Sequence, residues 1–190
     1  MKLSSVLFSC SIVLLCFSTD SLAETHYEFT IGGGVYALDV DQKFGDQIED
    51  DSSVTSISFG VYRDSGSEES TDETLDEQSF WGAVIEYSMP LGRDDNLPGN
   101  GQMIAFRPVN YLMLLDESSS MEFYAGIAQF DWIKTANGYL FGFNYRYNLF
   151  GESSGLMADF KYYQDLAYDS PQGDDIVDGF QSSIKFYYQF

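Results

Sequence analysis

Apolar and polar side chains alternate in runs along most of the chain. The clearest run is residues 139–149, YLFGFNYRYNL, in which an aromatic or leucine side chain occupies every second position. The last residues, SSIKFYYQF, repeat the pattern. Because successive side chains of a β-strand point to opposite faces, a period of two predicts strands with one apolar and one polar face.

Eight such runs are separated by clusters of Gly, Ser, Asp, Asn and Pro, residues typical of turns. They lie at about residues 27–40, 56–61, 81–89, 101–115, 121–133, 139–149, 156–165 and 182–190. Pro108 or Asn110 predicts a bulge in the fourth run, so the faces of the fourth and fifth runs stay unassigned. The pattern predicts an all-β fold of eight antiparallel strands.

The apolar faces allow two orientations. In a water-soluble sandwich or lipocalin-like barrel they point inward, whereas in a membrane barrel they point outward to lipid. Three features favour the membrane barrel. The apolar rows begin and end in aromatics, the runs approach the 9 to 11 residues that span a bilayer at a tilt, and the chain ends on an aromatic strand that can pair with the first. The sequence therefore predicts an eight-stranded antiparallel transmembrane β-barrel.

The first 23 residues differ from the rest. Met1-Lys2 is followed by an apolar stretch at residues 6–17 and by small residues at Ser21 and Ala23. This order predicts a cleaved signal peptide over residues 1–23 and a barrel domain over residues 24–190. Both cysteines, Cys10 and Cys16, fall in the signal peptide, so the barrel domain has no thiol for a disulfide or a metal.

These features together resemble the small eight-stranded outer-membrane proteins of Gram-negative bacteria, at the level of the class. The resemblance implies location in the bacterial outer membrane, with membrane lipid and lipopolysaccharide as neighbours. It also implies a terminal signal read by the barrel-assembly machinery during insertion. That signal falls on alternate residues of the last run: Ile184, Phe186, Tyr188 and Phe190.

The net charge of −21 accompanies an aromatic content of 17%. Such an acidic chain argues against a nucleic-acid partner, whose phosphates require Lys and Arg. The combination also predicts that charged and apolar groups are segregated in space. On the inward faces the alternation predicts a charge cluster that pairs and fills the lumen, because an eight-stranded interior is just wide enough for side chains. Its expected members are Glu86, Arg146, Asp159, Lys161, Lys185 and, beside them, Asp165.

Acidic residues also gather between the first two runs. An EF-hand does not fit them, since Lys43 and Phe44 stand where an oxygen ligand and a Gly are needed. We expect at most loosely bound divalent cations there, and no cofactor. The weak candidate ligands are Asp39, Asp41, Asp46, Glu49, Asp50 and Asp51.

The function is less constrained than the fold. Enzymes among barrels of this size class use a catalytic His, but the barrel domain has only His26, next to the expected cleavage site. We therefore expect a non-enzymatic protein with a structural or surface-interaction role toward ions, lipopolysaccharide or an external partner. A narrow channel or transporter for small or hydrophobic solutes is the alternative, and a lipid-modifying hydrolase that uses carboxylates is a third.

One stretch fits the expected topology poorly. Residues 64–78, DSGSEESTDETLDEQ, carry seven acids and no base. The strand count places them at the barrel end that carries both termini, where connections are usually short turns. Either this connection is unusual, or a further strand lies near residues 43–48.

Overall fold

The computed structural model describes residues 25–41, 48–64, 79–92, 101–130, 138–170 and 173–190. Side chains are described throughout these ranges except at 40–41, 48–50, 130, 167–170 and 173–177. The expected signal peptide lies outside them. No helix in these ranges is long and apolar enough to cross a membrane.

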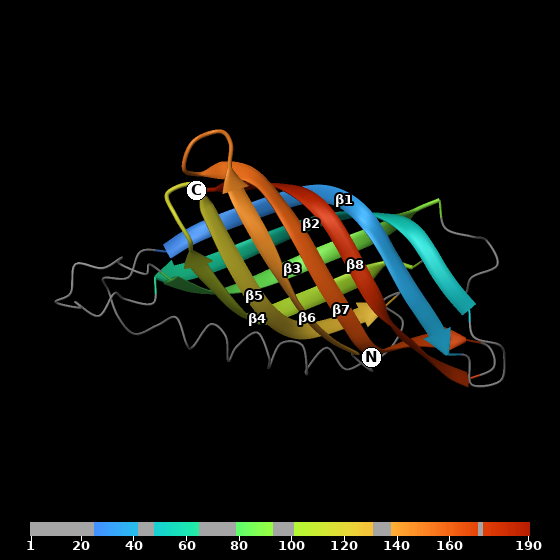
Figure 1. Ribbon diagram of the computed structural model, residues 1–190. Helices are drawn as coiled ribbons and strands as arrows, with labels where there is room; N and C mark the ends of the chain where they lie inside the picture. The colour runs from blue at the N-terminus through green and yellow to red at the C-terminus, as the bar shows by residue number, and fades with distance from the viewer. Residues whose placement is uncertain (1–24, 42–47, 65–78, 93–100, 131–137, 171–172) are drawn as a thin grey trace.

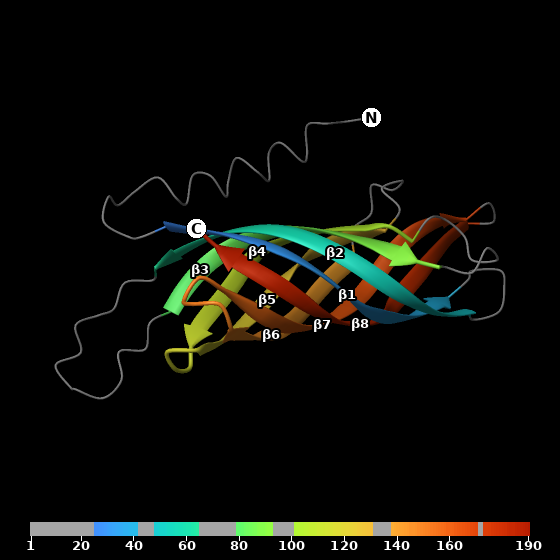
Figure 2. The ribbon, with the colours of Figure 1, turned by 90° about the horizontal axis from the view of Figure 1, so that it is seen from above.

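Eight strands form one closed antiparallel barrel in sequence order, β1-β2-β3-β4-β5-β6-β7-β8 (Figures 1 and 2). Their bounds are β1 Thr25–Asp41, β2 Ile48–Asp64, β3 Ser79–Leu91, β4 Met103–Leu114, β5 Ser119–Phe130, β6 Gly138–Asn148, β7 Ser154–Ser170 and β8 Gly173–Gln189. The predicted strand number and the predicted barrel are therefore confirmed.

The first and last strands close the wall. Phe29 pairs with Tyr188 and Ile31 with Phe186 in the β1–β8 register. Beyond that register, Tyr27 and Phe190 exchange two backbone hydrogen bonds of 3.0 and 2.9 Å. Closure leaves no strand edge unpaired, which a barrel in lipid requires because no water is available to satisfy backbone groups there.

Polar side chains point inward and large apolar side chains point outward. Arg146 is 1% exposed, whereas its neighbours on β6, Tyr145 and Tyr147, are 40% and 47% exposed. A water-soluble barrel shows the reverse arrangement, since apolar groups leave water on folding. The outward orientation predicted from the sequence is therefore confirmed, and the apolar outer surface is suited to contact with lipid.

Outward aromatic rings gather near both ends of the barrel. At the end that carries Thr25 and Gln189, which we call the terminal end, Trp81 packs on Tyr111 at 5.0 Å between ring centroids. Toward the opposite, far end, Tyr162 packs on Phe180 at 4.8 Å. Such rings favour the two interfaces of a bilayer, where an amphipathic ring meets both lipid and water.

Five strands are longer than predicted, and four of them are the longest in the barrel. β1, β2, β7 and β8 each run for 17 residues, and they lie next to one another in the wall. Residues 48–52 and 167–178 were expected to be mostly connectors because of their Asp, Ser and Gly content. The prediction was wrong there, since backbone pairing such as Leu38 with Asp50 and Asp169 with Asp174 extends both hairpins. Cross-strand pairing outweighs the weak local preference of these residues.

The expected bulge in the fourth run is present. The register of β4 against β5 shifts between Phe106 and Val109, so Arg107 points inward, Pro108 outward and Asn110 inward again. Proline lacks the N–H that a regular ladder would use and is therefore suited to a bulge. The bulge also explains why no single alternation described this run.

A second bulge was not anticipated. The β7–β8 register shifts between Tyr163 and Leu166, and Asp165 adopts a positive φ of 56°. Leu166 takes the inward place, while Asp165 is exposed and its N–H donates to Asp178 Oδ1 at 2.7 Å. The prediction that Asp165 faces the lumen was therefore wrong.

The position of the acidic stretch follows from the strand pairing. β1 and β2 are direct neighbours in the wall, paired from Thr25 with Arg63 to Val40 with Ile48. Residues 42–47, near which a further strand was considered, lie outside the described residues. β2 ends at Asp64 and β3 begins at Ser79, both at the terminal end. The connection of residues 65–78 thus starts and ends there, as the strand count predicted, and it is longer than the 115–118 and 149–153 turns at the same end.

The candidate site in the lumen

The lumen contains three layers of side chains. Near the terminal end lies the Arg146 cluster, made of Arg146, Glu28, Glu122, Tyr62 and Asn144. In the middle lies the Glu86 cluster, made of Glu86, Asp159, Lys161, Lys185 and Arg107. Toward the far end lies an apolar plug, which includes Leu38, Val54, Met103, Leu140 and Leu166.

Two acids and two lysines interlock in the Glu86 cluster. Lys185 Nζ lies 3.0 Å from Glu86 Oε1 and 2.7 Å from Asp159 Oδ2. Lys161 contacts the same two acids, at 3.1 Å from Asp159 and more closely at Glu86. Alternation on β3, β7 and β8 sends all four side chains inward, which is where the sequence pattern placed them.

Arg107 completes this cluster from the bulge of β4. Its Nη2 lies 3.8 Å from Glu86 Oε2, and its guanidinium lies over the ring of Tyr124 at 4.2 Å from the centroid. Tyr124 in turn donates a 2.6 Å hydrogen bond to Asp159 Oδ1. Arg107 was missed by the sequence analysis because the parity of the fourth run was unassigned.

Arg146 lies in a different layer from the residues it was grouped with. Its guanidinium contacts Glu28, and Nη2 lies 2.6 Å from Glu122 Oε2. Tyr62 donates to Glu122 Oε1 at 2.8 Å and accepts from Arg146 at 3.1 Å. Asn144 joins Arg146 to Glu122 as well. A buried guanidinium with this many acceptors is fully paired, which offsets the cost of its burial.

The two acids of the Arg146 cluster were also missed. Glu28 lies between the outward Tyr27 and Phe29, so the alternation of the first run contained the signal. Glu122 lies in the fifth run, whose parity was unassigned. The inward direction of the Glu122 side chain follows from the pairing of β5 with β4 and β6, which the sequence alone does not give.

The buried lumen charges balance. Among the described residues, the buried acids are Glu28, Glu86, Glu122 and Asp159, and the buried bases are Arg107, Arg146, Lys161 and Lys185. The whole net charge of −21 therefore lies outside this set. A neutral, internally paired lumen has no excess charge with which to attract an ion of either sign.

The lumen opens into a vestibule at the terminal end. This cavity has a volume of about 520 Å³ and includes His26, Asp116, Glu152 and Gln189 among its walls. Arg146 and Tyr62 also line it. His26 is half-buried there, with its ring edge-on to Phe80 at 5.4 Å. The edge-on contact with Phe80 accounts for its partial burial.

The weak metal candidates lie along the far-end hairpin of β1 and β2. Asp39 and Asp51 are exposed. Asp41, Glu49 and Asp50 lie within the two strands, but their side chains are not among those described. Asp46 falls outside the described residues. Asp39 pairs with Glu49 on one side and with Asp178 on the other in the backbone register. No group of three or more potential ligands close enough to hold a metal occurs among the residues described.

The closed eight-stranded wall, the apolar outer surface and the polar interior define a small transmembrane β-barrel of the outer-membrane class. The predicted class is therefore confirmed. No protein-family model and no curated protein matches the chain.

Solved structures similar to this chain include Ail, the attachment invasion locus protein of Yersinia pestis. Its TM-score is 0.41 at 12% identity, covering 87% of this chain and 99% of that one. Ail in complex with the heparin analogue sucrose octasulfate gives 0.40 at 11% identity, with the same coverage. The TodX deltaS2S3 mutant monoaromatic hydrocarbon channel gives 0.27 at 11% identity, covering 93% and 73%.

Proposed function

We propose that the protein is a non-enzymatic barrel of the bacterial outer membrane whose lumen is closed by its own side chains. The observation that carries this proposal is the sequence of layers along the lumen. A solute entering from the vestibule meets the Arg146 cluster, then the Glu86 cluster, then the apolar plug. Passage would require separating buried ion pairs. Each charged side chain that loses its partner while it stays buried in the lumen would cost free energy.

The role we propose for this closed barrel is to carry an acidic surface on its far end. The extended hairpins β1–β2 and β7–β8 lie side by side because β8 pairs with β1 (Figure 1). Acidic residues recur along them, such as Asp39, Asp51 and Asp178. Carboxylates are hard oxygen ligands, so divalent cations are the expected link between this surface and lipopolysaccharide phosphates or an external partner.

A catalytic role has less support. His26, the one histidine of the barrel domain, packs against Phe80, and the four buried acids of the lumen are all paired with bases. A general base needs a free proton-accepting position within reach of its nucleophile. These pairings leave none of the four buried lumen acids free to act as such a base.

A narrow channel is the second candidate, and one observation favours it. In the middle of the described lumen, several buried polar atoms have no hydrogen-bond partner, including Arg107 Nε and Nη1, Gln181 Nε2 and Ser183 Oγ. Buried polar groups are normally satisfied by protein or by water. Water at these atoms would hydrate the lumen locally, although the apolar plug still closes the far side.

Conductance across a planar bilayer distinguishes the two. We expect the purified full chain to give no discrete openings over a wide range of voltage. Steady openings of uniform size would overturn the closed-barrel proposal and establish the channel. For the surface role, calcium titration of the detergent-solubilised protein should show weak binding that falls when Asp39 and Asp51 are changed to Asn, with Glu117→Gln, in an exposed turn at the terminal end, as the control.

A further inference from the structure

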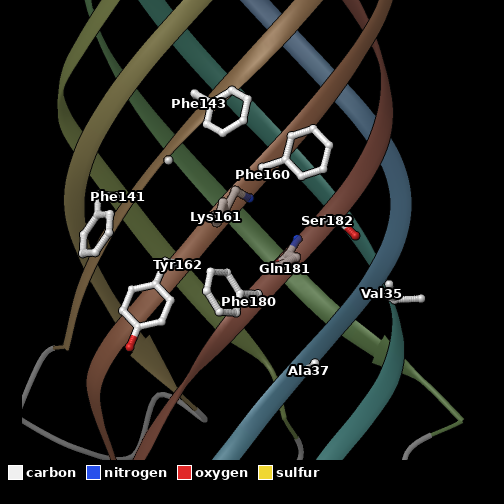
Figure 3. A pocket seen from close by; sticks show the side chains of 11 residues that line it. Val35, Ala37, Phe141, Phe143, Phe160, Lys161, Tyr162, Phe180, Gln181 and Ser182 are labelled. Atoms are coloured by element: carbon white, nitrogen blue, oxygen red, sulfur yellow. The ribbon is translucent and has the colours of Figure 1, made fainter.

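An apolar groove runs along the outside of the wall formed by β6, β7, β8 and β1 (Figure 3). Its volume is about 320 Å³, and it lies toward the far end of the barrel. Its place on the lipid-facing surface makes membrane lipid the natural occupant. We propose that this groove binds one acyl chain of a lipid in the leaflet at the far end.

The strand register explains why the surface is hollow at this place. Phe143, Phe160, Ser182 and Val35 form one outward row across the four strands. Phe141, Tyr162, Phe180 and Ala37 form the next row. Each row is bulky on β6 and β7 and contains one small side chain, Ser182 or Ala37. The small residues leave a depression beside a ridge of rings.

The ridge is held in place by contacts between its own rings. Phe143 stacks on Phe160 at 5.2 Å, Phe141 packs on Tyr162 at 5.2 Å, and Tyr162 packs on Phe180 at 4.8 Å. Rings fixed in this way lose little conformational entropy on binding, so a chain that enters the groove meets a preformed wall. A flat outer surface is covered by lipid too, but it would hold no chain in one position.

The groove is a surface site and not an opening into the lumen. Beneath it the β7–β8 ladder is continuous, with Lys161 paired to Gln181 and Tyr162 to Phe180. Lys161 and Gln181 border the groove with their backbones while their side chains are buried on the inner side (Figure 3). Lys161 is engaged by Glu86 and Asp159, so the wall at this level is sealed from inside. Lateral passage of a solute would require breaking that ladder.

The orientation of the lipid follows from Tyr162. Its hydroxyl points toward the far end in Figure 3, away from the rings of Phe143 and Phe160. A tyrosine in a membrane protein places its polar tip at the head-group level and its ring among the chains. The head group therefore lies near Tyr162, and the chain extends along Ser182 toward the middle of the membrane.

The test uses the full chain reconstituted in nanodiscs of dimyristoylphosphatidylcholine and then released in mild detergent for native mass spectrometry. Wild type should retain one bound lipid under conditions that strip the rest. Ser182→Phe, which fills the depression, should lose it. Ala83→Phe, which adds the same bulk to another outward position on β3, should keep it.

Equal retention by Ser182→Phe and wild type would overturn the proposal, as would equal loss by Ala83→Phe. Heat-modifiability on a gel checks that each variant is folded, and Ala37→Leu serves if Ser182→Phe does not fold. Saturable uptake of a free aromatic solute with no retained lipid would also overturn it. The proposal does not depend on the closed lumen, because bilayer conductance tests that separately and should be unchanged in Ser182→Phe.

Discussion

Lys185 and Glu86 meet in the centre of the barrel, with Nζ 3.0 Å from Oε1, although 99 residues separate them in the chain. They come from β8 and β3, which are not neighbours in the wall. Each of them also has a second partner in the cluster, Asp159 for Lys185 and Lys161 for Glu86. The contact therefore ties opposite sides of the barrel together through its interior, and its removal tests whether the lumen supports the fold.

Glu86→Gln should destabilise the barrel by about 3–5 kcal/mol, because it leaves two buried lysines sharing Asp159 alone. Urea unfolding in lipid vesicles, followed by tryptophan fluorescence, measures the change. The double variant Glu86→Gln/Lys185→Met restores the balance of the buried lumen charges, with three acids against three bases, so its loss should be smaller than the sum of the single losses. Additive losses would show that the two side chains act independently.

The depth of the apolar belt gives a second prediction. Ile85 is 51% exposed in the middle of β3, and Phe150 is 69% exposed in the turn after β6. Arg at the bilayer midplane costs about 2–4 kcal/mol, whereas near an interface it costs about 0–1 kcal/mol. Ile85→Arg should therefore lower the free energy of unfolding in vesicles far more than Phe150→Arg. In a barrel surrounded by water, both variants would be nearly neutral.

The sequence contained most of the architecture but only part of the lumen site. Alternation was regular on β3, β6 and β8, and on β7 as far as Tyr163. Glu86, Arg146, Asp159, Lys161 and Lys185 were therefore placed inward correctly from their neighbours. A face assigned from the alternating pattern is wrong after a bulge, because the added residue moves every later side chain of the strand to the face opposite the one the pattern predicts. This is why Arg107 was missed and Asp165 was misplaced.

Partner choice in the lumen was not accessible from the sequence at all. Arg146 was grouped with Asp159, yet it pairs with Glu28 and Glu122. The height at which a residue meets others across the lumen depends on the register of every strand between them. Periodicity gives the face of a residue but not that height.

The turn between β4 and β5 provides a pH prediction outside the membrane. Ser118 N–H donates to Asp116 Oδ1 at 2.7 Å, and Ser119 Oγ–H donates to Oδ2 at 2.6 Å. The hydrogen bond from the Ser119 hydroxyl, with those from Ser118, lowers the pKa of Asp116 to about 2. Since the folded value is depressed, the stabilisation of the turn is present above the ordinary pKa near 3.8 and is lost as pH falls through about 2.

A carboxyl-carbon NMR titration of Asp116 should therefore give a midpoint well below the ordinary value of 3.8 for an aspartate. Asp116→Asn should speed amide hydrogen exchange at Ser118 at neutral pH, because the charged acceptor is gone. A midpoint for Asp116 near 4 would mean that the turn does not hold the carboxylate as described.

The closing residue tests whether the chain end acts in assembly or only in stability. Phe190 stacks on Tyr27 at 5.9 Å and pairs with its backbone at the rim of the barrel. Phe190→Ser keeps the backbone bonds and removes the ring. If the alternate apolar residues of β8 form a signal read by the assembly machinery, this variant should reduce the amount of heat-modifiable barrel in cell membranes several-fold. Refolding of the purified chain into vesicles, where no machinery is present, should be nearly unchanged.

The control variant is Leu115→Ser, at an exposed turn of the same end, which should leave both yields intact. An equal decrease of the two yields for Phe190→Ser would assign the residue to stability alone, since the cellular loss would then need no recognition step to explain it.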